Sequence, residues 1–101
     1  PRVFTLEFGA DGTAFFRIDC NRGRGVWKAV PSSDPSTGAL AFGPLATTRM
    51  ACPPGSPDQQ VMRDLARVGS YRLKDGMLYL SLSGEGGVYE WIPMVAAAGV
   101  R

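Results

Sequence analysis

The stretch RIDCNRGRGVW (residues 17–27) lies where one predicted β-strand ends and the next begins. Apolar and polar residues alternate through Thr13–Cys20 and again through Val26–Val30, which is typical of strands with one buried face. Between the two runs, the glycines of NRGRG (residues 21–25) are expected to form a turn and to adopt positive φ there. The stretch therefore predicts two strands that meet at a corner carrying a cysteine, an asparagine and arginines.

Alternation of the same kind recurs along the chain on both sides of this corner. The further predicted strands are Val3–Phe8, Leu40–Phe42, Ala46–Met50, Tyr71–Lys74, Met77–Leu82 and Val88–Ile92. The Gly-containing turns between them, and the loop composition of PSSDPSTG (residues 31–38), favour antiparallel hairpins.

One segment, at about residues 58–68, has helical spacing instead. Its apolar stripe comprises Val61, Leu65 and Val68. We expect Ser56 or Asp58 to cap its start and Gly69 to end it. The sequence thus predicts a mainly β fold, a curled antiparallel sheet or partial β-barrel with one α-helix packed across it, which some definitions class as α+β.

Length and composition are typical of one small domain, and the sequence shows no evident set of catalytic residues. The 101 residues predict a single domain over 1–93 and a tail over 94–101 that frays. The net charge of +2 is too low to favour a nucleic-acid partner, and no apolar run is long enough for a membrane span. The chain has no histidine, which removes the commonest general acid–base, the commonest metal ligand and the usual partner of a serine or cysteine nucleophile. We therefore expect no catalytic residues, metal site, cofactor or enzymatic activity, and only the carboxylates hold open an enzyme as a third interpretation.

Two cysteines, Cys20 and Cys52, stand 32 positions apart without the spacing of a metal site. A disulfide is the favoured interpretation, and two buried free thiols are the alternative. A disulfide would place the protein outside the reducing cytosol.

Four residues near the corner are candidates for binding an anionic or glycan partner: Arg22, Arg24, Trp27 and Arg49. Guanidinium groups and turn amides can hold phosphate, sulfate or carboxylate groups. The simpler interpretation is a solvated turn with an ordinary structural role. Convergence of the three arginines in one concave site would favour binding, and their dispersal would favour the structural role.

Two other groups of side chains have both a functional and a structural interpretation. The aromatic residues are Trp27, Tyr79, Tyr89 and Trp91, which form either a stacking surface or part of the core. The carboxylates are Glu7, Asp19, Glu85 and Glu90, whose spacing gives no support to an acid–base pair. Core packing is favoured for the aromatic residues.

Three segments together resemble the META domain, also called the HslJ-like domain. They are DCNR (residues 19–22), LAFGPLATTRMACPP (residues 40–54) and YRLKDGMLYLSL (residues 71–82). The similarity covers roughly residues 3–93. Asp19 departs from the small residue usual before the cysteine, and Gln59-Gln60 stands where the family often has a glutamate. The family's opening strand, which normally carries a tryptophan, has no counterpart after Pro1, so we expect apolar surface that is exposed or covered by a partner.

The resemblance implies a curled antiparallel sheet crossed by a helix, in which Cys20 and Asn21 hold a turn against Thr48–Cys52. Such domains occur in bacterial secreted proteins and envelope lipoproteins, are associated with stress or antibiotic tolerance, and have no established activity or cofactor. The resemblance therefore predicts an extracytoplasmic, non-enzymatic domain, and a lipobox cysteine or signal peptide ahead of Pro1 would settle the compartment. The alternative is an inhibitor or ligand-binding module whose partner is an envelope protein or an anionic ligand.

Overall fold

The computed structural model describes residues 2–84 and 86–93, so the predicted frayed tail (94–101) and Glu85 lie outside the described residues. The elements are β1 (Phe4–Phe8), β2 (Thr13–Ile18), β3 (Asn21–Pro31), β4 (Thr37–Phe42), β5 (Ala46–Thr47), α1 (Asp58–Leu65), β6 (Val68–Lys74), β7 (Met77–Leu82) and β8 (Val88–Trp91).

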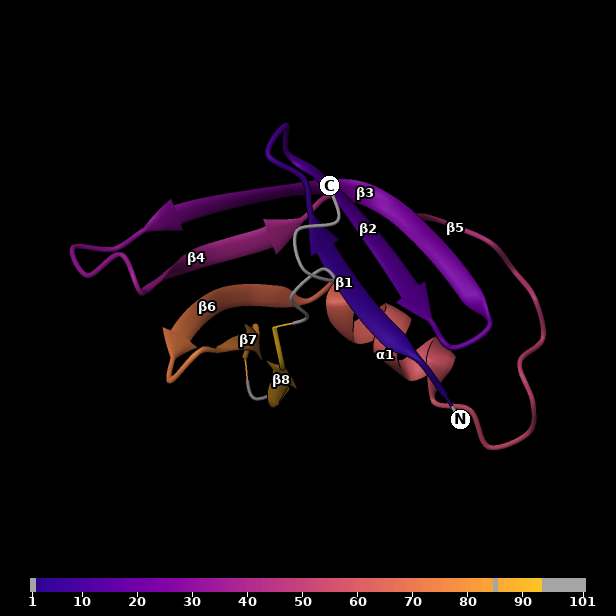
Figure 1. Ribbon diagram of the computed structural model, residues 1–101. Coiled ribbons are helices and arrows are strands. Elements are labelled where there is room, and N and C mark those ends of the chain that lie inside the picture. The colour runs from indigo at the N-terminus through magenta and orange to yellow at the C-terminus, as the bar shows by residue number, and fades with distance from the viewer. Residues whose placement is uncertain (1, 85, 94–101) are drawn as a thin grey trace.

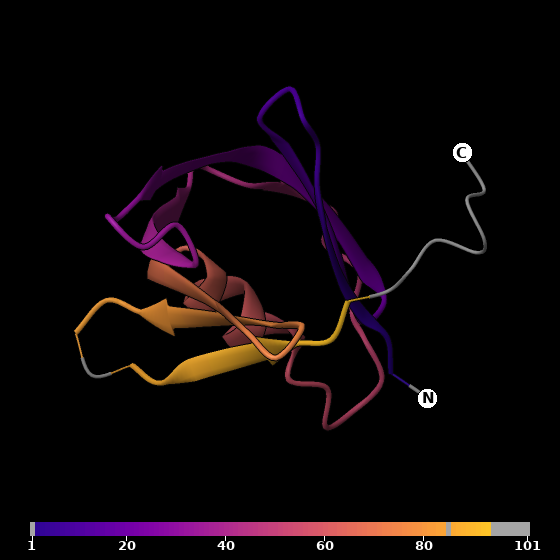
Figure 2. The ribbon, with the colours of Figure 1, turned by 60° about the vertical axis from the view of Figure 1, so that its left-hand side comes forward.

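The strands form one antiparallel sheet in the order β1-β2-β3-β4-β6-β7-β8, and β5 pairs with β3 outside this path. Strand β3 belongs to both halves of the sheet, because its first part pairs with β2 and its last part with β4. Figure 1 shows β3 arching between the two halves, and Figure 2 shows the resulting curl of the sheet. The predicted curled antiparallel sheet with one helix is confirmed.

The core lies on the concave side of the sheet, where α1 packs below β1 to β3 (Figure 1). Its buried members are Ala14, Phe16, Ile18, Leu40, Phe42, Val61, Leu65, Val68, Leu80 and Leu82. Strands β2, β4 and β7 contribute alternate residues, as strands with one buried face require. The helix adds Val61 and the fully buried Leu65.

The predicted turn at residues 21–25 is wrong, because β3 already begins at Asn21. The turn consists of Asp19 and Cys20 alone, since Ile18 pairs directly with Asn21. Asp19 has φ +56°, a region that aspartate tolerates better than most residues.

The glycines of this segment serve close packing instead of the turn. Neither Gly23 nor Gly25 has positive φ. A methyl group on Gly25 would lie 2.7 Å from Leu45 Cδ2, and one on Gly23 would lie 3.1 Å from Thr47 Cγ2. The two glycines therefore let the segment around β5 approach the inner side of β3.

The helix is shorter than predicted, because it ends at Leu65 and Val68 opens β6. A tight turn, in which the Arg67 amide donates to the Asp64 carbonyl at 2.8 Å, returns the chain to the sheet. Val68 is buried as predicted but reaches the core from a strand. Gly69 does not end the helix. It lies at a register shift between β6 and β7.

Three of the four candidate aromatic residues pack against the core, which confirms the favoured interpretation for them. The ring of Trp27 meets Phe8 edge-on at 5.3 Å between centroids. Tyr89 and Trp91 stack at 6.5 Å between centroids. Tyr79 lies between Leu78 and Leu80 on β7 and therefore faces the opposite side of the sheet. The four do not form one stacking surface.

Leu65→Ala should lower the free energy of unfolding by roughly 2–5 kcal/mol, because it removes a fully buried side chain from the contact between helix and sheet. Leu73→Ala is the matched control, since the Leu73 side chain on β6 is 52% exposed and should cost less than about 1 kcal/mol. Urea unfolding measures both variants. Equal losses would contradict the assignment of Leu65 to the core.

Candidate functional site

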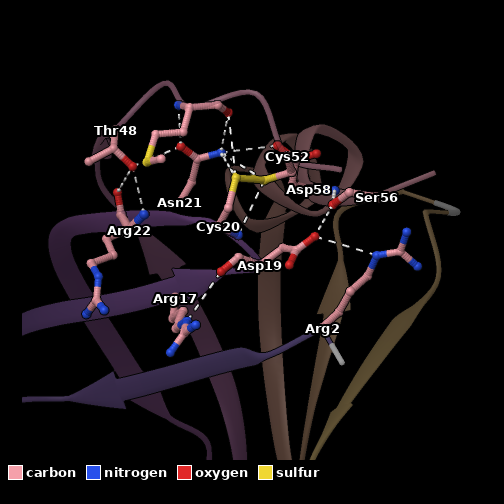
Figure 3. Close-up of a disulfide and its surroundings, with 11 residues drawn as sticks. Arg2, Arg17, Asp19, Cys20, Asn21, Arg22, Thr48, Cys52, Ser56 and Asp58 are labelled. Carbon is pink, nitrogen blue, oxygen red and sulfur yellow. Dashed lines mark hydrogen bonds and ion pairs between the residues drawn. A yellow bond between two sulfur atoms is a disulfide. The ribbon is translucent and has the colours of Figure 1, made fainter. Parts of the chain in front are cut away.

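A disulfide fastens the turn between β2 and β3 to the segment that precedes α1. Cys20 and Cys52 are joined with 5.4 Å between their Cα atoms, and the Cys20 amide also donates to Cys52 Sγ at 3.3 Å. The favoured disulfide is thus confirmed against the alternative of two free thiols. Figure 3 shows the bridge above the ends of the strands, with polar side chains gathered on either side of it.

Asn21 is the hub of this corner, and its side chain is only 2% exposed. Its Oδ1 accepts from the Met50 amide at 2.7 Å and from Thr48 Oγ1 at 2.9 Å. Its Nδ2 donates to the Met50 carbonyl at 3.0 Å and to Asp58 Oδ2 at 3.2 Å (Figure 3). One buried amide therefore ties β3 to the loop before the helix and to the first turn of the helix. The predicted contact between Asn21 and the segment 48–52 is confirmed.

Thr48 continues the pairing of β5 with β3 by one residue. Its amide donates to the Arg22 carbonyl at 2.9 Å, and its Oγ1 accepts from the Arg22 amide at 2.9 Å. The threonine hydroxyl thus completes the pairing in the place of a backbone carbonyl. This replacement leaves the backbone after Thr48 free to turn away from the sheet toward Cys52.

Asp19 connects the turn to the start of the helix. Its Oδ2 accepts from Ser56 Oγ at 2.5 Å and lies 3.5 Å from Arg2 Nε. Ser56 Oγ in turn accepts from the Asp58 amide at 3.3 Å. The N-cap position itself is Pro57, so the predicted cap by Ser56 or Asp58 is corrected: Ser56 reaches the first turn from one residue earlier.

A groove of about 460 Å³ runs beside the corner, and Arg49 is one of its lining residues. Further lining residues are Thr47, Ala51, Gln59, Met62 and Arg63. Arg22 and Arg24 do not line this groove. They project from the outward side of β3, where their side chains are exposed. The structure therefore does not bring the three candidate arginines together in one concave site.

Trp27, the fourth candidate for ligand binding, is half-buried and already engaged. Its Nε1 donates to the Gly9 carbonyl at 2.9 Å. Its ring packs against Phe8 and the core. This position suits a structural role.

A second buried carboxylate, Asp64, holds α1 against β8. Asp64 Oδ2 accepts from the Tyr89 hydroxyl at 2.6 Å, and Asp64 Oδ1 accepts from Gln60 Nε2 at 2.9 Å. Burial of the phenol, reinforced by this bond to a carboxylate, raises the pKa of Tyr89 from 10.0 to about 12. The arrangement fixes the last turn of the helix.

An apolar groove of about 410 Å³ separates β1 from β8, the two ends of the strand order. Phe4, Val61, Tyr89 and Trp91 are among its lining residues, and Trp91 Nε1 is buried there without a hydrogen-bond partner among the described residues. At its rim, Ile92 is 78% exposed. Apolar surface of the kind expected from the resemblance is thus present.

The described carboxylates do not form an acid–base pair. Asp19 is engaged by Ser56 and Arg2, Glu7 is exposed on the outward side of β1, and Glu90 lines the apolar groove between β1 and β8. Among residues 2–84 and 86–93, no three His, Cys, Asp or Glu side chains are grouped as metal ligands. The one helix within those ranges is too short to cross a membrane. The polar groups at the corner bind one another.

Sequence reasoning missed Asp58 and Asp64 as buried partners of the corner and of Tyr89. The signal was present, because both carboxylates fall on the same helical stripe as Val61 and Leu65. A charged residue on an apolar stripe requires a partner, since burying it unpaired is costly. Asn21 and Tyr89 are those partners.

Opening the disulfide should lower the free energy of unfolding by roughly 3–4 kcal/mol in the chain-entropy account, since it releases a loop of 32 residues. Cys20→Ala/Cys52→Ala and the reduced wild type should lose the same amount in urea. Alkylation under denaturing conditions, followed by intact mass, verifies the starting state. Full alkylation of the unreduced wild type would show that the bridge is absent.

The fold should lose stability as the pH rises from 10.0 to about 12, because folding holds the Tyr89 hydroxyl protonated while the unfolded chain ionises near 10.0. The stabilisation is fully present below the lower of these pKa values and is lost through the upper one. Tyr89→Phe should flatten this dependence in urea unfolding at a series of pH values. A pH dependence of Tyr89→Phe as steep as that of the wild type would contradict the assignment.

No curated protein matches the chain. Its fold is similar to that of a DUF4847 family protein from Bacteroides vulgatus ATCC 8482, known from a crystal structure, with a TM-score of 0.59 and 20% sequence identity. The similarity covers 88% of this chain, which spans 57% of the length of the Bacteroides protein. At that identity the likeness concerns the fold alone. The sequence matches the META domain over residues 1–91, and the chain therefore belongs to the META domain family.

Proposed function

We propose that this META domain is a non-enzymatic module that works outside the reducing cytosol, as part of a secreted protein or an envelope lipoprotein. The disulfide corner carries the proposal. Cys20 and Cys52 join two segments that Asn21 and Thr48 also hold together, and such bridges persist in oxidising compartments.

The hydrogen bonding of the buried polar side chains within the fold supports a non-catalytic module. Asn21, Asp58 and Asp64 are all buried, and each is hydrogen-bonded to another part of the fold. Asn21 and Asp58 line the groove beside the corner, but their side chains are hydrogen-bonded to each other and to the loop before the helix, and this engagement supports a structural role. We infer that the corner maintains the shape of the domain, and that stability outside the cell supports a role in stress or antibiotic tolerance.

Trapping the thiols in living cells tests the compartment. Cells that express the full-length protein from its own start are quenched in acid, alkylated and fractionated, and the protein is resolved by mass. We expect the chain to be oxidised and found outside the cytosolic fraction. A form that is fully alkylated in the cytosolic fraction would refute the proposal. Cys52→Ser controls for alkylation of a single remaining thiol.

The second candidate function is binding of an anionic partner, and one observation favours it. Arg22 and Arg24 project from the same side of β3, and Arg17 of β2 is the direct neighbour of Arg22. Arg49 and Trp27 are not needed for this version, since Arg49 lines the separate groove and Trp27 packs inward.

A further inference from the structure

The outward side of β2 and β3 carries a cluster of positive charge, which we call the basic face. It comprises Arg17, Arg22, Arg24 and Lys28, all exposed. The outward positions of β1, β2 and β3 carry one carboxylate, Glu7, which is paired directly with Phe15 and lies diagonally from Arg17. In the turn before β2, hydrogen bonds from Thr13 and, to a smaller extent, the charge of Arg24 lower the pKa of Asp11. The four basic side chains nevertheless concentrate positive charge on one side of β2 and β3.

The arrangement of the arginines is unfavourable for the isolated domain. Arg17 lies directly opposite Arg22, and like charges in that position repel each other across a sheet. Arg24 stacks over the Phe15 ring with 5.8 Å from the guanidinium carbon to the ring centroid. None of the three makes an ion pair among the residues that the structure describes. An anionic partner would relieve this repulsion.

Apolar side chains stand among these charges. Val26 and Val30 are each 58% exposed, and they flank Lys28 on the outward side of β3. Phe15 is 42% exposed beside Arg24. A valine makes no hydrogen bond and gains only from an apolar environment. A partner that fits the whole face must therefore offer both negative charge and an apolar phase.

We propose that the basic face docks on the surface of an anionic lipid bilayer, with its arginines among the headgroups and Val26 and Val30 at the acyl boundary. Bilayer interfaces combine these two properties, and basic residues beside exposed apolar ones are the usual means of binding them. An acidic glycan or a nucleic acid would satisfy the arginines and leave both valines in water.

This docking orients the corner. Arg22 points away from the disulfide, whereas Arg17 Nε donates to the Asp19 carbonyl in the turn at 3.3 Å (Figure 3). None of the four basic residues lines the groove beside the corner, so docking through them leaves that groove open. The inference adds a partner to the proposed role outside the cytosol and rests on that role only for the compartment in which the lipid is met.

Vesicle co-sedimentation tests the proposal on the purified, oxidised protein. The lipids are equal parts of phosphatidylglycerol and phosphatidylcholine, with pure phosphatidylcholine as the reference. We expect binding to the anionic vesicles alone, weakened by salt. Arg17→Gln/Arg22→Gln/Arg24→Gln should weaken it on the order of a hundredfold, since each basic residue at such a surface is worth about fivefold.

Two further variants test whether binding depends on the basic face itself or only on the total positive charge of the protein. Arg63→Gln/Arg72→Gln/Lys74→Gln removes three exposed positive charges from α1 and β6 and should bind nearly as the wild type does. Val26→Thr/Val30→Thr keeps the shape and charge of the strand and should weaken binding by about tenfold or more. Equal loss in the charge control, or no loss in the threonine variant, would overturn the proposal.

A measurement on the wild type guards against a variant that fails to fold. Lipid with a paramagnetic headgroup should broaden the amide resonances of β2 and β3 and spare those of α1. Broadening centred on α1 would refute the assigned face. Binding to a sulfated glycan in the absence of vesicle binding would refute the lipid. None of these results depends on where the protein is found in the cell, so they stand apart from the thiol-trapping experiment.

Discussion

The fold depends on one buried side-chain amide. Asn21 joins β3, the loop before the helix and the helix itself through hydrogen bonds that include two to Met50 and one each to Thr48 and Asp58. A hydrophobic side chain could not replace it, because the part-buried hydrogen bonds to the Met50 amide and carbonyl and the bond to buried Asp58 would be lost. The amide supplies both the donors and the acceptor that an irregular loop needs when it crosses the end of a sheet.

The disulfide and the Asn21 amide stabilise the loop before the helix in different ways. The bridge limits the freedom of the unfolded chain between Cys20 and Cys52, whereas Asn21 selects one conformation of the loop in the folded state. A domain of this size buries too little surface to hold so long a connection by apolar packing alone. The loop between Thr47 and Asp58 contains no regular element, so its order comes from these side chains.

Alternation and turn chemistry were enough to predict the strands, the single helix and the curled sheet, because these depend on local periods of two and of about 3.6 residues. They failed at NRGRG, where glycine was interpreted as a turn signal. The glycines instead admit Leu45 and Thr47 against β3, a long-range contact without a local signature. The end of the helix failed for a related reason, since Val68 reaches the same core from a strand as it would from a helix.

At the candidate site, too, some features were predictable from the sequence and others were not. The cysteine pair and the role of Asn21 were accessible from the sequence and the family resemblance, but the placing of the arginines was not. Once Asn21 is known to begin a strand, Arg22 and Arg24 must face one side and Gly23 and Gly25 the other. The inward glycines allow close packing, and the outward arginines are left to solvent. On β3, therefore, the residues that hold the corner, Asn21 and Gly23, alternate with the exposed Arg22 and Arg24, which can meet a partner.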